Sequence, residues 1–167
     1  SQAPLIVNFI TAGIPTEPVD AKAHGLKVQR IIKDQMGAAV ENNEFRHGES
    51  YLVELHLVCP TDLKNVIVSD LLPAGFEIEN PRLDATVPMV SEAESGDTRG
   101  MATPEYLEIR DDRLIAAFSE LNRGEHVYRS LVRAVTAGTF QYPGMHAECM
   151  YDPEIYAITA PKTIEIK

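Results

Sequence analysis

The sequence has no tryptophan, only two cysteines and no long apolar run. The apolar stretch nearest its start, residues 5–10, is interrupted by Asn8 and has the length of a strand. A membrane-spanning helix needs about 20 apolar residues, and nothing basic precedes this stretch as it would in a signal peptide. We therefore expect no direct membrane insertion, and either a cytosolic domain or a piece of a longer exported protein.

Basic residues are also few, with 15 Lys and Arg against 25 Asp and Glu and a formal net charge of −10. A nucleic-acid-binding surface needs a basic stripe, but here Lys and Arg are scattered singly along the chain. The negative charge also argues against adhesion to anionic lipid. A solvated acidic surface and no nucleic-acid partner are expected.

Catalytic motifs are missing as well. The phosphate-binding patterns GxGxxG and GxxxxGK do not occur, and no serine lies in a nucleophile elbow. Residues 110–113 read RDDR, which is more simply a solvated charge cluster in a turn than an acid–base pair. His146, Cys149 and Asp152 have ligand-like spacing, but isolated pairs of this kind usually lie in packing or on the surface. We predict no catalytic residue, metal or cofactor, and hence no enzyme.

The strongest positive signal is period-two alternation of apolar residues. In residues 51–59, Val53, Leu55 and Leu57 share one face and Glu54 and His56 the other. Further β-rich runs occupy residues 26–32, 65–72, 106–110, 113–118, 125–136, 139–142 and 163–167. Alternation leaves each sheet with one wet face, which favours antiparallel pairing.

Short strands separated by turn signals predict an all-β fold, an antiparallel Ig-like β-sandwich of about seven to nine strands. Asp111 and Asp112 lie between two of the runs and predict a hairpin with a two-residue turn. One domain is expected over residues 1–167. Residues 1–20 would form a leading strand or linker, and the polar residues 85–103 a mobile loop.

The two cysteines, Cys59 and Cys149, have no CxxC partner. Cys59 has the parity of the inward-facing residues of its strand. In an Ig-like order this strand is the second and residues 139–146 the sixth, so both cysteines would lie beside adjacent loops at one end. A disulfide and two unpaired buried thiols are both consistent with this placement.

Residues 146–157, HAECMYDPEIYA, combine loop signals with apolar side chains. Asp152 and Pro153 predict a loop, yet Met150 and Tyr151 cost free energy to leave in water. Either these side chains fold back onto the core, or they cover part of another domain.

The stretch VSDLLPAGFEIENPRL, residues 68–83, resembles the closing, tenth macroglobulin-like domain of bacterial alpha-2-macroglobulins. LPAG-type turns also occur in Ig-like repeats of bacterial surface proteins, so this piece alone is weak. Further matching pieces stand in the family's order and extend the likeness to residues 12–167. They are GLKVQRIIKDQMG, YLVELHLV, EIRDDRLIAAF, VYRSLVRAVTAGTFQYP and AECMYDPEIYA.

The resemblance implies a macroglobulin-like β-sandwich within a periplasmic, membrane-associated protease trap. In that family, cleavage of a bait region triggers a rearrangement that exposes an internal thioester, which acylates the protease. The thioester lies in another domain, in a Cys-x-Glu-Gln motif, whereas Cys149 is followed by Met-Tyr-Asp. The implied partners are therefore the thioester domain, other macroglobulin-like domains of the parent chain and, through the parent, target proteases.

The resemblance also suggests a role for Met150 and Tyr151. In thioester-bearing members, a Met-Tyr dipeptide of the closing domain covers the thioester before activation. A flexible thioether and a flat ring close an irregular gap well, and we expect both side chains to be exposed in the isolated domain. The alternative for the whole chain is an Ig-like structural or ligand-binding module of a bacterial surface adhesin, which would place it at the cell surface.

Overall fold

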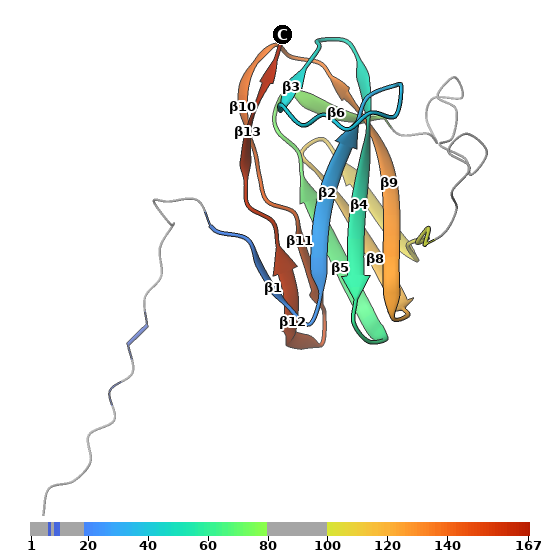
Figure 1. Cartoon of the computed structure of the whole chain (residues 1–167). Coiled ribbons are helices and arrows are strands. Elements are labelled where there is room, and N and C mark those ends of the chain that lie inside the picture. Colours follow the sequence, from blue (N-terminus) through green and yellow to red (C-terminus); the bar gives the residue numbers. More distant parts are fainter. Residues whose placement is uncertain (1–6, 8, 11–18, 80–99) are drawn as a thin grey trace, which may run out of the picture.

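The computed structural model describes residues 7, 9–10, 19–79 and 100–167. Within them the chain forms thirteen β-strands (Figure 1). In order they are β1 (Lys22–His24), β2 (Lys27–Lys33), β3 (Glu44–Phe45), β4 (Ser50–Cys59), β5 (Leu63–Leu71), β6 (Phe76–Glu79), β7 (Tyr106–Arg110), β8 (Arg113–Leu121), β9 (Gly124–Ala134), β10 (Gly138–Tyr142), β11 (His146–Cys149), β12 (Asp152–Ile158) and β13 (Lys162–Ile166).

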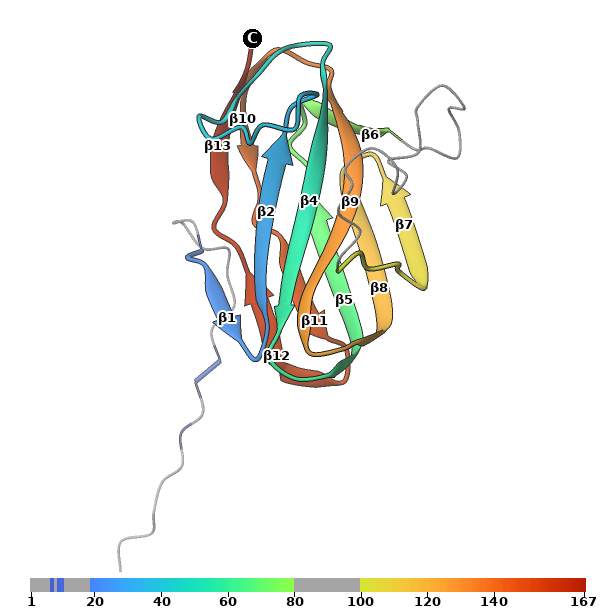
Figure 2. The ribbon, with the colours of Figure 1, turned by 45° about the vertical axis from the view of Figure 1, so that its right-hand side comes forward.

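The strands form two facing layers with a small sheet at one end. A four-stranded sheet of order β2-β4-β9-β6 faces a six-stranded sheet of order β1-β12-β11-β5-β8-β7. The third sheet, β10-β13-β3, extends beyond β11 and β12 at the end where the C-terminus lies (Figures 1 and 2). Among the described strand pairs, only β3 and β13 run parallel. The predicted antiparallel β-sandwich is confirmed.

The number of strands exceeds the seven to nine that the sequence predicts. β1, β3 and β6 have two to four residues each, too few to show an alternation of their own. They are strands because a longer neighbour offers them a free edge. The predicted β7–β8 hairpin is confirmed, since Arg110 pairs with Arg113 across Asp111 and Asp112.

Alternation along β4 places the core. Val53, Leu55 and Leu57 point between the sheets and are buried. β5 and β8 supply the opposing layer with buried residues of the same parity, including Val68 and Ala116. Burial of an aliphatic side chain contributes about 1.5–3 kcal/mol, so the side chains between the two sheets stabilise the fold.

A buried ion pair joins the two layers. Arg30 of β2 has the inward parity of its strand and pairs with Asp70 of β5. Its guanidinium also donates to the Pro143 carbonyl oxygen at 2.9 Å and lies 3.7 Å from the Tyr142 ring centroid. Burial raises the pKa of Asp70, and the Arg30 charge opposes that rise without cancelling it. The ion pair between Arg30 and Asp70 was not predicted from the sequence, although both residues interrupt apolar faces.

A close backbone crossing connects the six-stranded sheet to the small end sheet. Gly144 lies between β10 and β11, and Thr159 lies just after β12. Thr159 accepts a hydrogen bond at its hydroxyl from the Met145 amide and donates one from its own amide to the Met145 carbonyl, each 2.9 Å long. A Cβ atom at Gly144 would lie 2.0 Å from the Thr159 carbonyl oxygen. Only glycine permits this crossing.

Two predicted segments fall wholly or mainly outside the described residues. Most of the leading segment 1–20 and residues 85–99 of the predicted loop lie there. The end of that loop is described, and the Ala102 amide donates to the Val127 carbonyl oxygen at 2.9 Å. In the part of the chain that the structure describes, no helix has the length and apolarity to span a membrane.

Candidate functional site

Residues 146–158 form a β-hairpin, so the prediction of a loop here is wrong. β11 lies between β5 and β12, and Cys149 pairs with Asp152. Met150 and Tyr151 are therefore the two-residue turn of the hairpin. Two neighbouring strands supply backbone hydrogen bonds to β11, and this tertiary pairing outweighs the local loop signals of Asp152 and Pro153.

A register shift explains why Pro153 does not break the hairpin. Cys149 pairs with Asp152, but the preceding residue, Glu148, pairs with Tyr156. Residues 153–155 of β12 thus have no partner on β11 and form a bulge. A bulge is a site where proline is tolerated, because no ladder hydrogen bond is required from it.

The hairpin tip, which we define as Met150 and Tyr151, is held by its backbone while its side chains project outward. The Met150 amide donates to the Asn65 carbonyl oxygen at 2.9 Å. Met150 is 52% exposed and Tyr151 is 81% exposed. Their expected exposure is confirmed, and an apolar tip on a fixed backbone offers a contact surface for another domain.

The spacing of His146, Cys149 and Asp152 does not produce a metal site. His146 and Cys149 lie on opposite faces of β11, because their positions differ by an odd number of residues. The His146 ring lies 3.8 Å from the Glu148 carboxylate, on the outer face, whereas Cys149 is buried. Among the described residues, no group of three or more His, Cys, Asp and Glu side chains could hold a metal.

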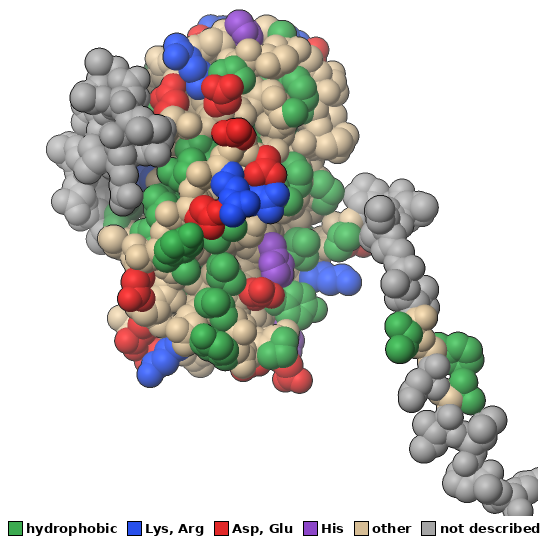
Figure 3. Space-filling view, turned by 180° about the vertical axis from the view of Figure 1, so that it is seen from behind, with side chains coloured by type: hydrophobic (Ala, Val, Ile, Leu, Met, Phe, Trp, Pro, Cys, Tyr) green, Lys and Arg blue, Asp and Glu red, His purple; other side chains and the backbone are tan. Residues whose placement is uncertain are grey.

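Residues 110–113 form a solvated charge cluster, as their sequence predicts. Arg110 pairs with Glu108, and Arg113 lies 2.6 Å from the Asp112 carboxylate. Figure 3 shows the face of the six-stranded sheet, where basic and acidic side chains stand among apolar ones. Exposed ion pairs of this kind contribute little to stability.

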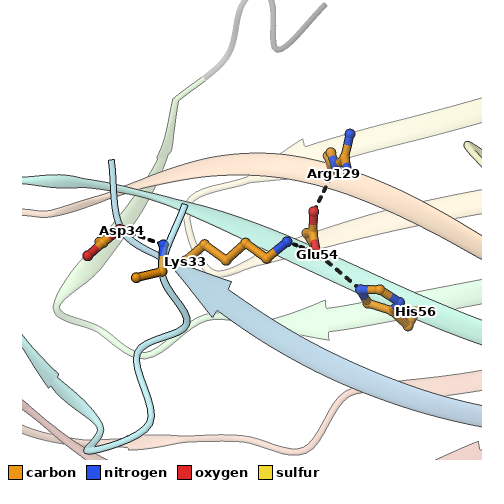
Figure 4. A network of polar contacts seen from close by, with 6 residues as sticks. Lys33, Asp34, Glu54, His56 and Arg129 are labelled. Atoms are coloured by element: carbon orange, nitrogen blue, oxygen red, sulfur yellow. Dashed lines mark hydrogen bonds and ion pairs between the residues drawn. The ribbon is translucent and has the colours of Figure 1, made fainter. Parts of the chain in front are cut away.

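An ion-pair network centred on Glu54 lies on the outer face of the four-stranded sheet (Figure 4). Glu54 of β4, expected on a wet face, is only 2% exposed. Its carboxylate lies 2.8 Å from Lys33 Nζ, 2.9 Å from Arg129 Nε and 3.2 Å from His56 Nε2. Burial by itself raises the pKa of Glu54, but the hydrogen bonds from Lys33, His56 and Arg129 outweigh it, so the net pKa is lowered. The network ties β2, β4 and β9 together.

Glu54 is expected to make the stability of the domain depend on acid pH. Its folded pKa lies below the ordinary value of 4.5, so its contribution is fully present above that pH and is lost as pH falls through the folded pKa. Glu54→Gln should lower the free energy of unfolding by about 1–3 kcal/mol at neutral pH. Urea denaturation between neutral pH and about pH 3 measures both effects.

The difference between the original chain and Glu54→Gln should shrink at acid pH, because a protonated glutamate resembles glutamine. Glu165→Gln is a matched control, since this side chain is half exposed at 51% and forms an exposed ion pair with Lys167. A constant Glu54→Gln effect across the whole pH range would contradict the role assigned to the carboxylate charge.

The antiparallel β-sandwich has the architecture of macroglobulin-like domains. Residues 25–154 match the family described as "Bacterial Alpha-2-macroglobulin MG10 domain". The chain belongs to this family and is a domain of the bacterial alpha-2-macroglobulin type.

Similar proteins agree with this membership. Alpha-2-macroglobulin of Escherichia coli strain K12 is 32% identical, with 98% of this chain and 10% of the relative covered. The protein of that name from Xylella fastidiosa strain 9a5c is 30% identical, again with 98% and 10% covered. The crystal structure of Salmonella alpha-2-macroglobulin reacted with methylamine has a TM-score of 0.79 at 32% identity, covering 93% of this chain and 10% of that one.

The chain thus spans about a tenth of the length of these curated relatives. A crystal structure of native E. coli alpha-2-macroglobulin, running from domain MG7 to the C-terminus, matches with a TM-score of 0.80 at 28% identity. The match covers 93% of this chain and 25% of that structure, so in the E. coli protein the corresponding domain stands beside others. These findings do not favour the adhesin alternative.

Proposed function

We propose that this domain shields the thioester of a neighbouring domain by placing the hairpin tip over it. The observation that carries the proposal is the exposure of Met150 and Tyr151 on a backbone fixed by β5. A thioester survives only where water and amines are excluded, and the tip supplies a thioether and an aromatic ring for that purpose.

The energetics favour a covered tip. Burying a methionine or tyrosine side chain against a partner contributes roughly 1.5–3 kcal/mol. The hairpin turn and the Met150–Asn65 hydrogen bond hold the backbone in place, so little conformational entropy is lost when the tip docks. The contact is then strong enough to protect the thioester, yet small enough to break when the parent molecule rearranges.

In this proposal the domain is non-catalytic and works within a larger chain. Its partners are the thioester domain and other macroglobulin-like domains, and the parent is a periplasmic, membrane-anchored inhibitor that traps proteases. Two features support this assignment: the family to which the chain belongs, and the absence from its sequence of the Cys-x-Glu-Gln motif that would form a thioester.

Tyr151→Gly is expected to speed spontaneous loss of the thioester in a full-length parent that contains one. Losing about 1.4 kcal/mol of covering contact corresponds to about tenfold in the open population. Methylamine incorporation and thiol release measure the rate. The melting temperature of the domain itself should stay nearly unchanged, because Tyr151 contacts solvent rather than the core.

Met36→Gly is a matched control for this experiment. Met36 is 90% exposed and comes three residues after β2. β2 ends at the end of the sandwich opposite the β11–β12 turn (Figure 1). Its replacement should leave methylamine incorporation unchanged. If Tyr151→Gly and Met36→Gly give the same rate as the original parent with its thioester intact, the shielding role is wrong.

A further inference from the structure

The two cysteines end strands that belong to opposite sheets. Cys59 is the last residue of β4, in the four-stranded sheet, and Cys149 is the last residue of β11, in the six-stranded sheet. Both side chains point between the sheets and are buried. Both strands end at the same end of the sandwich, as Figures 1 and 2 show.

The connections around the two cysteines bring them into the same corner of the core. The chain turns after Cys59 and enters β5 at Leu63. Cys149 pairs with Val66 on that strand, and the next amide, that of Met150, donates to the Asn65 carbonyl oxygen. Cys149 therefore lies beside the first residues of β5, next to the short turn that joins β5 to the end of β4.

The electrostatics agree with this proximity. Burial raises the pKa of the Cys59 thiol to about 11, and the Cys149 thiol adds to the rise through its charge. Burial also raises the pKa of Cys149, with a further contribution from Asp152. The Cys149 contribution acts only when that thiol is ionised, so it reports that the two sulfur atoms are near each other. In this structure both cysteines are free and buried.

We propose that Cys59 and Cys149 form a disulfide that links the two sheets at the base of the hairpin tip. The oxidant is a disulfide compound, either small or carried by a thiol oxidoreductase. One thiolate attacks it and releases a first thiol, and the second cysteine then displaces a second thiol. Two Cys thiols and one oxidant disulfide become one Cys–Cys bond and two oxidant thiols, with both protons transferred to the products.

The bond forms during folding rather than after it. The raised pKa of both buried thiols keeps their thiolate fraction low in the folded chain, and exchange needs the thiolate. In the unfolded chain both thiols have ordinary pKa values and are open to the oxidant. A bond between Cys59 and Cys149 closes a long loop and so constrains the unfolded chain. The melting temperature of the bridged form should therefore be higher than that of the dithiol form by roughly 10 °C.

The test refolds the whole chain from denaturant in a buffer of oxidised and reduced glutathione. The product is denatured without reduction and treated with iodoacetamide, and its intact mass is measured by mass spectrometry. The expected product is a monomer two hydrogens lighter than the dithiol, with no alkylated cysteine before reduction and two after it. The Cys59→Ser and Cys149→Ser chains should lack the two-hydrogen loss and the rise in melting temperature.

Two alkylated thiols in the unreduced monomer would overturn the proposal, as would glutathione attached to both cysteines or a disulfide between two chains. Comparison of the refolded original chain with both serine variants by circular dichroism shows whether each has folded. The outcome is independent of thioester shielding: a missing bridge leaves the exposed tip unchanged, and a formed bridge does not require a thioester partner.

Discussion

Arg30→Met is expected to lower the free energy of unfolding by about 3–5 kcal/mol at neutral pH, because it leaves Asp70 buried without its partner. Asp70 is buried, and the charge and hydrogen bond of Arg30 oppose the rise in its pKa that burial causes. The variant also loses the hydrogen bond to Pro143 and the contact with Tyr142. Urea denaturation, with the slope m compared to that of the original chain, measures the loss.

The pH dependence of this loss has a definite sign. Burial already raises the pKa of Asp70, and removing Arg30 raises it further. A carboxyl with a raised folded pKa is destabilising when ionised, and that cost disappears as pH falls through the folded pKa. The Arg30→Met variant should therefore recover part of its stability in acid, which is opposite in sign to the effect of Glu54.

Two further variants test whether the unpaired charge of Asp70 causes the loss of stability. Replacing both partners, as Arg30→Met with Asp70→Leu, should restore most of the stability, because a well-packed apolar pair often matches a buried ion pair. Arg110→Met removes an exposed partner of Glu108 and should leave the free energy of unfolding nearly unchanged. An equal loss in the single and double variants would show that packing, and not the unpaired charge, is responsible.

Gly144→Ala is expected to destabilise the domain by about 3 kcal/mol, since the added Cβ would overlap a backbone atom. The Thr159 carbonyl oxygen lies 2.0 Å from that position, and moving it would separate the chain segments that join the end sheet to the hairpin strands. The melting temperature should fall by roughly 6–12 °C, which differential scanning calorimetry measures directly.

Gly75→Ala is the matched comparison. A Cβ at Gly75 would lie 2.6 Å from side-chain atoms of Ile166 and Phe140. Side chains can turn aside where a backbone carbonyl cannot, so the loss should be smaller than at Gly144. A Gly144→Ala chain as stable as the original would mean that the crossing of β10–β11 and β12–β13 can open without cost.

The sequence by itself determined the fold class and most of the long strands. The alternation of Val53, Leu55 and Leu57 reflects a constraint that acts within one strand, because neighbouring side chains must point to opposite faces. The same holds for the β7–β8 hairpin, whose Asp111 and Asp112 turn is read locally. The residues of the tip, Met150 and Tyr151, left open whether they fold onto the core, and their exposure was expected only from the resemblance to bacterial alpha-2-macroglobulins.

Only the tertiary structure decided the conformation around that tip. Pro153 signals a loop within its own segment, but β5 and β12 both pair with β11 and move the proline into a bulge. Glu54 and Arg30 show the same limit. A charged residue in an alternating strand predicts only which face it takes, whereas its burial and pKa depend on partners such as Arg129 and Asp70. Those partners come from distant parts of the chain, and only folding brings their charges within hydrogen-bonding distance.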